Sequence, residues 1–213
     1  MDNYLNAILV IVLVLNLLLL GTSRINTIIQ TVSAQGALLG IIPFVMHQRL
    51  TLPDVLIAVM AIALKGIAIP LIMVHALREA QIKREIEPMI GLLPSIILGA
   101  VATAFALLFA NQLPLASQHV GKLLVPTSIA TVFSGFIILT TRYKALTQVV
   151  GYLVLENGIY IFGMLLIEAM PHIVELGALL DLFVGIFVIC IIANRINRAF
   201  SSMDTRRLVT LKE

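Results

Sequence analysis

Residues 4–22 read YLNAILVIVLVLNLLLLGT, and this stretch sets the character of the whole chain. An α-helix needs about 20 predominantly apolar residues to cross the hydrocarbon of a bilayer, and the stretch is that long. We expect an uncleaved membrane helix and not a signal peptide. The reasons are that Met1-Asp2-Asn3 places no basic residue in front of it and that the apolar run is longer than the core of a signal.

The composition agrees with a membrane protein. Of 213 residues, 60 % are hydrophobic and 12 % are charged, with a mean hydropathy of +1.08. A soluble domain carries roughly 45–50 % apolar and about 25 % charged residues, so a soluble enzyme, a disordered tail and a secreted disulfide scaffold are excluded. Cys190 is the single cysteine, and CxxC motifs and His/Cys clusters are absent from the sequence. We therefore expect no metal site and no cofactor within this chain.

Six further stretches have a similar length and apolar character, so the sequence predicts an all-α, polytopic membrane protein with seven transmembrane helices. These stretches are residues 26–46, 52–77, 89–111, 122–141, 145–168 and 172–194. In the second span Gln30, Ser33 and Gln35 make the first half polar, and a partly interfacial helix is the alternative there.

The distribution of Lys and Arg predicts the orientation, because basic residues concentrate in cytoplasmic loops. If the N-terminus lies outside, the cytoplasmic segments hold eleven of the 14 basic residues, namely Arg24, Arg78, Lys83, Arg84, Arg142, Lys144, Arg195, Arg198, Arg206, Arg207 and Lys212. The outer segments hold only Arg49 and Lys122. We therefore expect an outside N-terminus and a cytoplasmic C-terminus. The basic residues behind the pI of about 9.2 then mark the cytoplasmic side of the membrane, and binding of nucleic acid is not needed to explain them.

Three ionisable residues lie in the middle of predicted spans: Lys65, Glu156 and Asp181. A charge at the bilayer centre costs roughly 2.5–3.5 kcal/mol on insertion scales, so such residues mark functional or structural contacts. At a rise of about 1.5 Å per residue, they lie roughly 18 Å, roughly 16 Å and roughly 20 Å from the inner ends of their spans, which is one layer. One interpretation is a lateral path along which protonation is passed. The others are a buried ion pair that locks helices together and contacts with other subunits.

The neighbours of these residues add detail. Tyr152 and Tyr160 lie one helical turn on either side of Glu156, and their phenols are expected to donate to the carboxylate. Asn157 points about 100° away around the same helix, toward a second neighbour.

Asp181 is flanked by glycines, and Lys65 is followed by a proline. Gly177 and Gly185 flank Asp181 one turn away on each side, which indicates close approach of another helix. Pro70 removes the N–H that would bond the carbonyl of Gly66, so we expect a kink and a free carbonyl beside Lys65.

Two weaker patterns concern helix contacts. Gly36-Ala37-Leu38-Leu39-Gly40 has the small-xxx-small spacing of a helix–helix contact. In the fifth span Thr127, Ser128, Thr131 and Ser134 are expected to bond their own helix backbone.

Two stretches resemble a known family. QVVGYLVLENG at 148–158 and GALLDLFVG at 177–185 resemble the second and third helices of the small three-helix subunit of respiratory complex I and of multisubunit sodium/proton antiporters. Gly151, Asn157, Asp181 and Gly185 fall at matching positions. Glu156 lies one turn beyond the family glutamate, and Asp181 replaces a glutamate; a shift of one turn keeps the same helix face.

As a whole, the chain resembles the hydrogenase-4 component E family of membrane subunits. The resemblance divides it into a four-helix region at 1–111, a three-helix region at 112–194 and a basic cytoplasmic tail at 195–213. It implies a non-redox subunit in the prokaryotic cytoplasmic membrane, beside antiporter-like subunits of a nickel–iron hydrogenase-like complex. Glu156 and Asp181 would then be proton-exchanging carboxylates with Lys65 as charge partner or relay, and Tyr152, Tyr160, Asn157, Gly151, Gly177 and Gly185 would support them.

Alternatives from other classes stay open. The chain could be a structural scaffold that holds antiporter-like subunits together, or a standalone ion transporter. No HExxH, GxSxG, P-loop or GxGxxG motif occurs in the sequence, so we expect no catalysis by this chain itself.

Overall fold

The computed structural model describes residues 2–46, 52–79, 89–113 and 123–166. Within these ranges every element of regular secondary structure is a helix. The helices are α1 (Asp2–Gly21), α2 (Ile25–Met46), α3 (Leu52–Ala61), the π-helix η1 (Ile62–Ala68), α4 (Ile69–Glu79), α5 (Leu92–Ala110), α6 (Leu124–Thr141) and α7 (Ala145–Leu166). α3, η1 and α4 follow one another without a break and together form one long rod.

Six helices in the described ranges are long and apolar enough to cross a membrane. They coincide with the first six predicted spans, which are confirmed as such helices, and they make this a multi-pass membrane protein. The third of them runs through α3, η1 and α4. The predicted seventh span, 172–194, lies outside the described residues, and the orientation stays a prediction.

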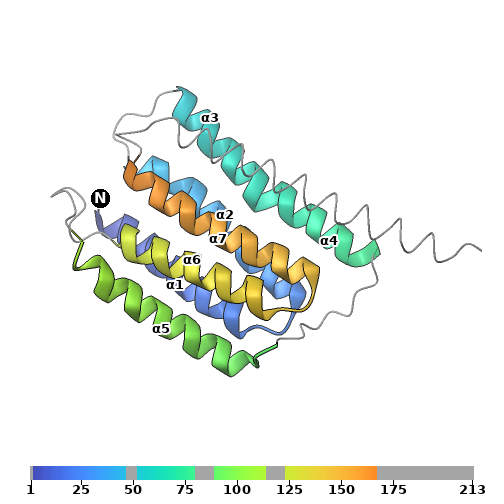
Figure 1. Ribbon diagram of the computed structural model, residues 1–213. Helices are drawn as coiled ribbons and strands as arrows, with labels where there is room; N and C mark the ends of the chain where they lie inside the picture. The colour runs from blue at the N-terminus through green and yellow to red at the C-terminus, as the bar shows by residue number, and fades with distance from the viewer. Residues whose placement is uncertain (1, 47–51, 80–88, 114–122, 167–213) are drawn as a thin grey trace, which may run out of the picture.

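The bundle has a central ring of four helices with one flanking rod on each side (Figure 1). In the ring, α1 packs on α2, α2 on α7, α7 on α6, and α6 on α1. α5 covers the side formed by α1 and α6, and the rod α3–η1–α4 covers α2. Polar side chains of α1, α2, α6 and α7 can therefore meet inside the ring.

The flanking rods expose apolar surface to their surroundings. Only 17 % of the α5 span and 22 % of the Ala58–His75 span are buried inside the structure, against 61 % of the α7 span. Side chains such as Leu93, Val101 and Leu108 on α5 are largely exposed. These outer faces suit lipid tails or neighbouring apolar helices, whereas α7 belongs to the interior.

Glycines allow α6 and α7 to touch backbone to backbone. A Cβ built on Gly135 would lie 2.4 Å from the backbone nitrogen of Leu155, and one on Gly151 would lie 2.6 Å from the nitrogen of Leu139. A Cβ on Gly158 would lie 2.7 Å from the nitrogen of Val132. No side chain fits at these three positions, so the close contact fixes the position of α7 against the ring.

Arg142, counted in the sequence as a loop charge, is fully buried at the end of α6. Its Nη2 donates to the carbonyl of Leu20 at 3.0 Å, and Gln148 Nε2 donates to the backbone carbonyl of Arg142 at 2.9 Å. Burial lowers the pKa of the Arg142 guanidinium from its ordinary value, although an arginine stays protonated in proteins. The residue ties the end of α1 to the turn between α6 and α7.

Candidate functional site

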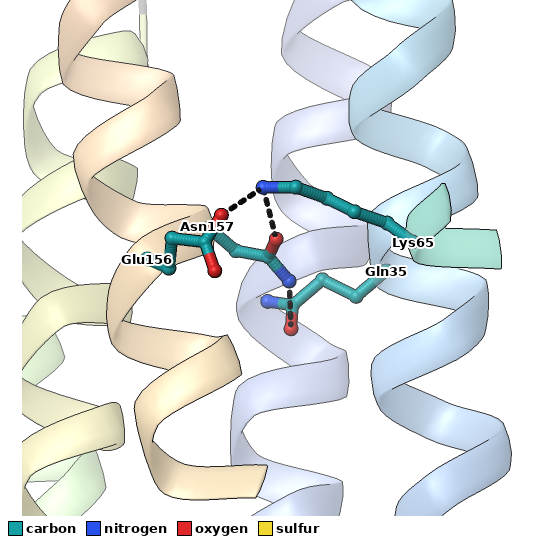
Figure 2. Close-up of polar contacts among 4 residues, drawn as sticks. All are labelled: Gln35, Lys65, Glu156 and Asn157. Atoms are coloured by element: carbon teal, nitrogen blue, oxygen red, sulfur yellow. Dashed lines mark hydrogen bonds and ion pairs between the residues drawn. The ribbon is translucent and has the colours of Figure 1, made fainter. Parts of the chain in front are cut away.

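Lys65 and Glu156 form a buried ion pair in the middle of the membrane-spanning region. Lys65 Nζ lies 2.9 Å from Glu156 Oε1, and the two side chains are 7 % and 4 % exposed (Figure 2). Lys65 comes from η1 and Glu156 from α7, so the pair connects the flanking rod to the ring. The prediction that these two residues share one depth is confirmed by this contact.

Lys65 sits at the centre of a π-helical turn that the sequence explains. Pro70 has no N–H to donate, and the backbone before it widens, with the N–H of Ile69 bonding the carbonyl of Leu64 five residues back. Ser33 Oγ of α2 donates to the carbonyl of Gly66 at 2.6 Å. The predicted available carbonyl is therefore present, and α2 supplies its partner.

The small-xxx-small pattern of α2 packs on this turn, as predicted. A Cβ on Gly36 would lie 2.7 Å from Lys65 Cβ, and one on Gly40 would lie 2.3 Å from a side-chain carbon of Ile62. Ala37 faces Gly66 in the same contact. The absence of side chains at Gly36 and Gly40 lets the Lys65 backbone lie directly against α2 and aims its side chain across to α7.

This contact makes Gly36→Ala a sharp test of the geometry. The added methyl group is expected to push Lys65 away from α2 and reduce the coupling between Lys65 and Glu156 by about 1–2 kcal/mol, measured with a double-mutant cycle on thermal unfolding in detergent. Gly66→Ala is the matched control, because the nearest atom to its Cβ is Ala37 Cβ at 3.4 Å, an ordinary contact distance. An unchanged coupling in Gly36→Ala would contradict this account of how Lys65 is placed.

A row of amide side chains leads away from Lys65 through the ring. Lys65 Nζ donates to Asn157 Oδ1 at 3.3 Å, and Asn157 Nδ2 donates to Gln35 Oε1 at 3.4 Å (Figure 2). Gln35 Nε2 donates to Asn16 Oδ1 at 2.9 Å, and Asn16 Nδ2 donates to Thr131 Oγ1 at 2.8 Å. We call Asn157, Gln35 and Asn16, with Thr131 at the end, the amide row. It crosses the bundle from α7 through α2 and α1 to α6.

The row lies in the buried interior. Asn16, Gln35 and Thr131 are fully buried, and Asn157 is 2 % exposed. A buried amide without partners costs on the order of 1–3 kcal/mol, so each link restrains the helices on either side of it. Two of the polar residues in the first half of the second span therefore face inward, with Gln35 in the row and Ser33 on the π-turn, whereas Gln30 is exposed.

Tyr160 contacts Lys65 through its ring and not through its hydroxyl. Lys65 Nζ lies 5.1 Å from the centroid of the Tyr160 ring, a cation–π distance. The Tyr160 hydroxyl and both Glu156 carboxylate oxygens have no hydrogen-bond partner among the described residues, although Oε1 has its ion pair. The expected donation from Tyr160 to Glu156 is therefore not formed. Tyr152 is partly buried against the apolar core.

A small cavity opens beside the ammonium group. It is lined by Val32, Lys65, Ile69, Pro70, Leu153 and Asn157, and it has room for about one water molecule. Water at this place would contact Lys65 and Asn157, the two polar residues of the lining.

The chemistry of these groups limits what each can do. Lys65 and Glu156 can exchange a proton, whereas side-chain amides donate and accept hydrogen bonds without titrating. A proton can therefore pass between Lys65 and Glu156, but it cannot pass along the amide row. Among the described residues no group of three His, Cys, Asp or Glu side chains is placed to hold a metal ion.

The remaining predicted residues separate into two groups. Gly151 lies in the α6–α7 contact, so its role in the structure is to admit the α6 backbone. Asp181, Gly177 and Gly185 lie outside the described residues, and their part in the site stays a prediction. Thr131 and Ser134 bond the carbonyls of Thr127 and Ala130 in their own helix, as predicted. The prediction is wrong for Thr127, whose hydroxyl has no hydrogen-bond partner among the described residues.

The sequence reasoning overlooked two members of the site. Asn16 lies within the apolar run of α1 and is not among the predicted site residues. Thr131 is predicted to bond only the backbone of its own helix. The position of Asn16 in the middle of an apolar span is the signal that identifies it. An amide at that depth needs a buried partner, as a charge does.

Comparison with known proteins places the chain in a family. Over 203 residues the chain is 32 % identical to the uncharacterized protein Rv0085 of Mycobacterium tuberculosis, covering 93 % of this chain and 91 % of that protein. The chain belongs to the Rv0085 family. No family model matches the chain, and no solved structure matches it.

A more distant similarity connects the family to a hydrogenase subunit. The chain is 24 % identical over 148 residues to the hydrogenase-4 component E of Escherichia coli and to that of Shigella flexneri, which covers 70 % of this chain and 68 % of each relative. The chain is therefore a membrane protein distantly related to hydrogenase-4 component E, which agrees in part with the resemblance stated above.

Proposed function

We propose that this chain is a non-redox membrane subunit of a hydrogenase-4-type complex in the prokaryotic cytoplasmic membrane. It helps to couple electron transfer to proton or sodium translocation, with Glu156 and Asp181 as ion-exchanging carboxylates and Lys65 as the charge partner. The assembled complex is the oxidoreductase, and this chain contributes no catalytic residue. Its partners are antiporter-like and other membrane-arm subunits.

The buried Lys65–Glu156 pair carries this proposal. Two titratable groups 2.9 Å apart in the buried middle of a bundle can shift between an ionised and a neutral pair by moving one proton. A π-turn holds one of them, and π-turns occur frequently at functional sites. The relation to hydrogenase-4 component E supports the setting, and the exposed flanking rods leave apolar faces for neighbouring subunits.

The test replaces both carboxylates with amides of the same shape. Glu156→Gln/Asp181→Asn is introduced into the native complex, assembly is checked by co-purification, and ion pumping is measured in inverted membrane vesicles. We expect assembly to be retained and pumping to fall at least tenfold, since an amide cannot take up a proton. Full pumping by assembled double variants would refute the proposal.

A scaffold role is the second candidate, and the amide row favours it. The row joins α7, α2, α1 and α6 by buried side-chain contacts that would hold a rigid bundle for partner subunits. A scaffold predicts that the double variant fails to assemble and that any assembled fraction pumps normally. The same experiment therefore separates the two functions.

A further inference from the structure

We propose that Gln35, Asn16 and Thr131 are positioning residues for the Lys65–Glu156 pair: through the amide row they hold the Asn157 carbonyl oxygen on Lys65 and favour its charged form. The relevance of this inference to ion translocation rests on the proposed function. The arrangement of the row rests on the hydrogen bonds alone.

Every link of the row has a direction that is imposed from its Lys65 end. An ammonium group only donates, so Asn157 must turn its oxygen toward Lys65 and its nitrogen toward Gln35. Gln35 must then present its oxygen to Asn157 and its nitrogen to Asn16. Each amide thus fixes the orientation of the next one.

Thr131 completes the row in the same direction. Its hydroxyl accepts from Asn16 Nδ2 and donates to the carbonyl of Thr127 at 2.7 Å. If all amides were reversed, Thr131 would have to donate to Asn16 and lose its bond to Thr127. The α6 end of the row therefore prefers the direction that suits a charged Lys65.

The reversed row is incompatible with an ammonium group. It would bring the Asn157 NH₂ group against Lys65, donor against donor, whereas a neutral amine could accept from it. The observed direction thus stabilises the charged form, and breaking the row removes that preference. The weakest link is Asn157 to Gln35 at 3.4 Å, the longest contact of the row.

α7 supplies two groups that act on the charge of Lys65: Glu156 pairs with it, and the Tyr160 ring contacts it. α2 and α6 carry no titratable side chain, and the titratable residues of α1, Asp2 and Tyr4, lie at its first turn. Neutral dipoles are therefore what α2, α1 and α6 contribute.

Gln35→Met tests the proposal, because methionine has a similar length but neither donates nor accepts strongly. The readout is infrared titration of the Glu156 carboxyl in the purified full-length chain, assigned by its loss in Glu156→Gln. We expect the pH at which this carboxyl ionises to rise by about one unit, a tenfold change in the equilibrium, because a less favoured ammonium stabilises the carboxylate less.

Thr31→Val is the matched control on α2. The Thr31 hydroxyl is also buried but bonds only the carbonyl of Thr27 in its own helix, so its loss should leave the titration unchanged. A titration of Gln35→Met that equals the wild type, or a shift of the same size in Thr31→Val, would overturn the proposal.

A second pair keeps the test decisive if Gln35→Met does not fold. Thr131→Val removes the hydroxyl at the end of the row and should raise the ionisation pH in the same direction, whereas Thr131→Ser keeps the hydroxyl and should titrate as the wild type. Ser134→Ala, which removes an equivalent hydroxyl bonded only to Ala130, should also leave it unchanged. Failure of the proposed function would appear in the pumping of Glu156→Gln/Asp181→Asn, and this titration is independent of that result.

Discussion

Lys65→Met is expected to destabilise the folded chain by about 3–5 kcal/mol, because it leaves a carboxylate buried without its partner. Glu156 is 4 % exposed, and its carboxylate oxygens have no hydrogen-bond partner among the described residues, so the lost ammonium leaves the buried charge without compensation from them. In thermal unfolding of the purified chain in detergent, this corresponds to a drop in Tm on the order of 10 °C.

The double variant Lys65→Met/Glu156→Gln should recover most of that loss, since a neutral amide is far easier to bury than a charge. Arg24→Met is the control, because Arg24 is an exposed basic residue in the turn between α1 and α2 and should change Tm by little. Equal melting of Lys65→Met and Arg24→Met, or a double variant less stable than Lys65→Met, would contradict the reading of the pair as a buried ion pair.

Gly135→Ala is expected to force α6 and α7 apart. The new Cβ would lie 2.4 Å from Leu155 N and 2.7 Å from Leu155 Cα, which are backbone atoms that cannot rotate away. Overpacking of this kind costs typically about 1–3 kcal/mol, and Gly135→Leu should prevent folding. Because Leu155 precedes Glu156, the displacement also shifts the carboxylate from its position against Lys65.

The measurement is thermal unfolding, together with the Lys65–Glu156 coupling energy from a double-mutant cycle; both should fall in Gly135→Ala. Gly21→Ala is the matched control, since its Cβ meets only the end of the Ile96 side chain at 2.8 Å, and that end can change rotamer. If Gly135→Ala melted no lower than Gly21→Ala, the backbone contact would not be the element that positions α7.

Much of the fold was predictable because each transmembrane helix can be recognised from its own segment of the sequence. Each span satisfies its own backbone hydrogen bonds, so a window of about 20 residues contains the whole signal. The available carbonyl ahead of Pro70 and the Gly36–Gly40 contact were predictable for the same reason, because they depend on local chemistry. The π-helical form of this turn was not, since a missing N–H leaves open whether the helix kinks or widens.

The site was predictable only where charge made a residue conspicuous. Lys65 and Glu156 stood out because ionised groups are rare in hydrocarbon, and a comparison of depths placed them together. The Tyr160 hydroxyl was misjudged, because sharing a helical face does not determine whether a donor and an acceptor point at each other. Its ring, turned toward Lys65, is the part that interacts.

The sequence by itself determined that the chain crosses the membrane, where its first six spans run and which charges lie within them. Hydropathy and helical rise are properties of one segment and need no partner. Only the tertiary structure decided that Asn16, Gln35, Asn157 and Thr131 form one directed row ending on Lys65. Links such as Asn157 to Gln35 join residues 122 positions apart, and they exist only once helix packing has set the rotation and spacing of the helices.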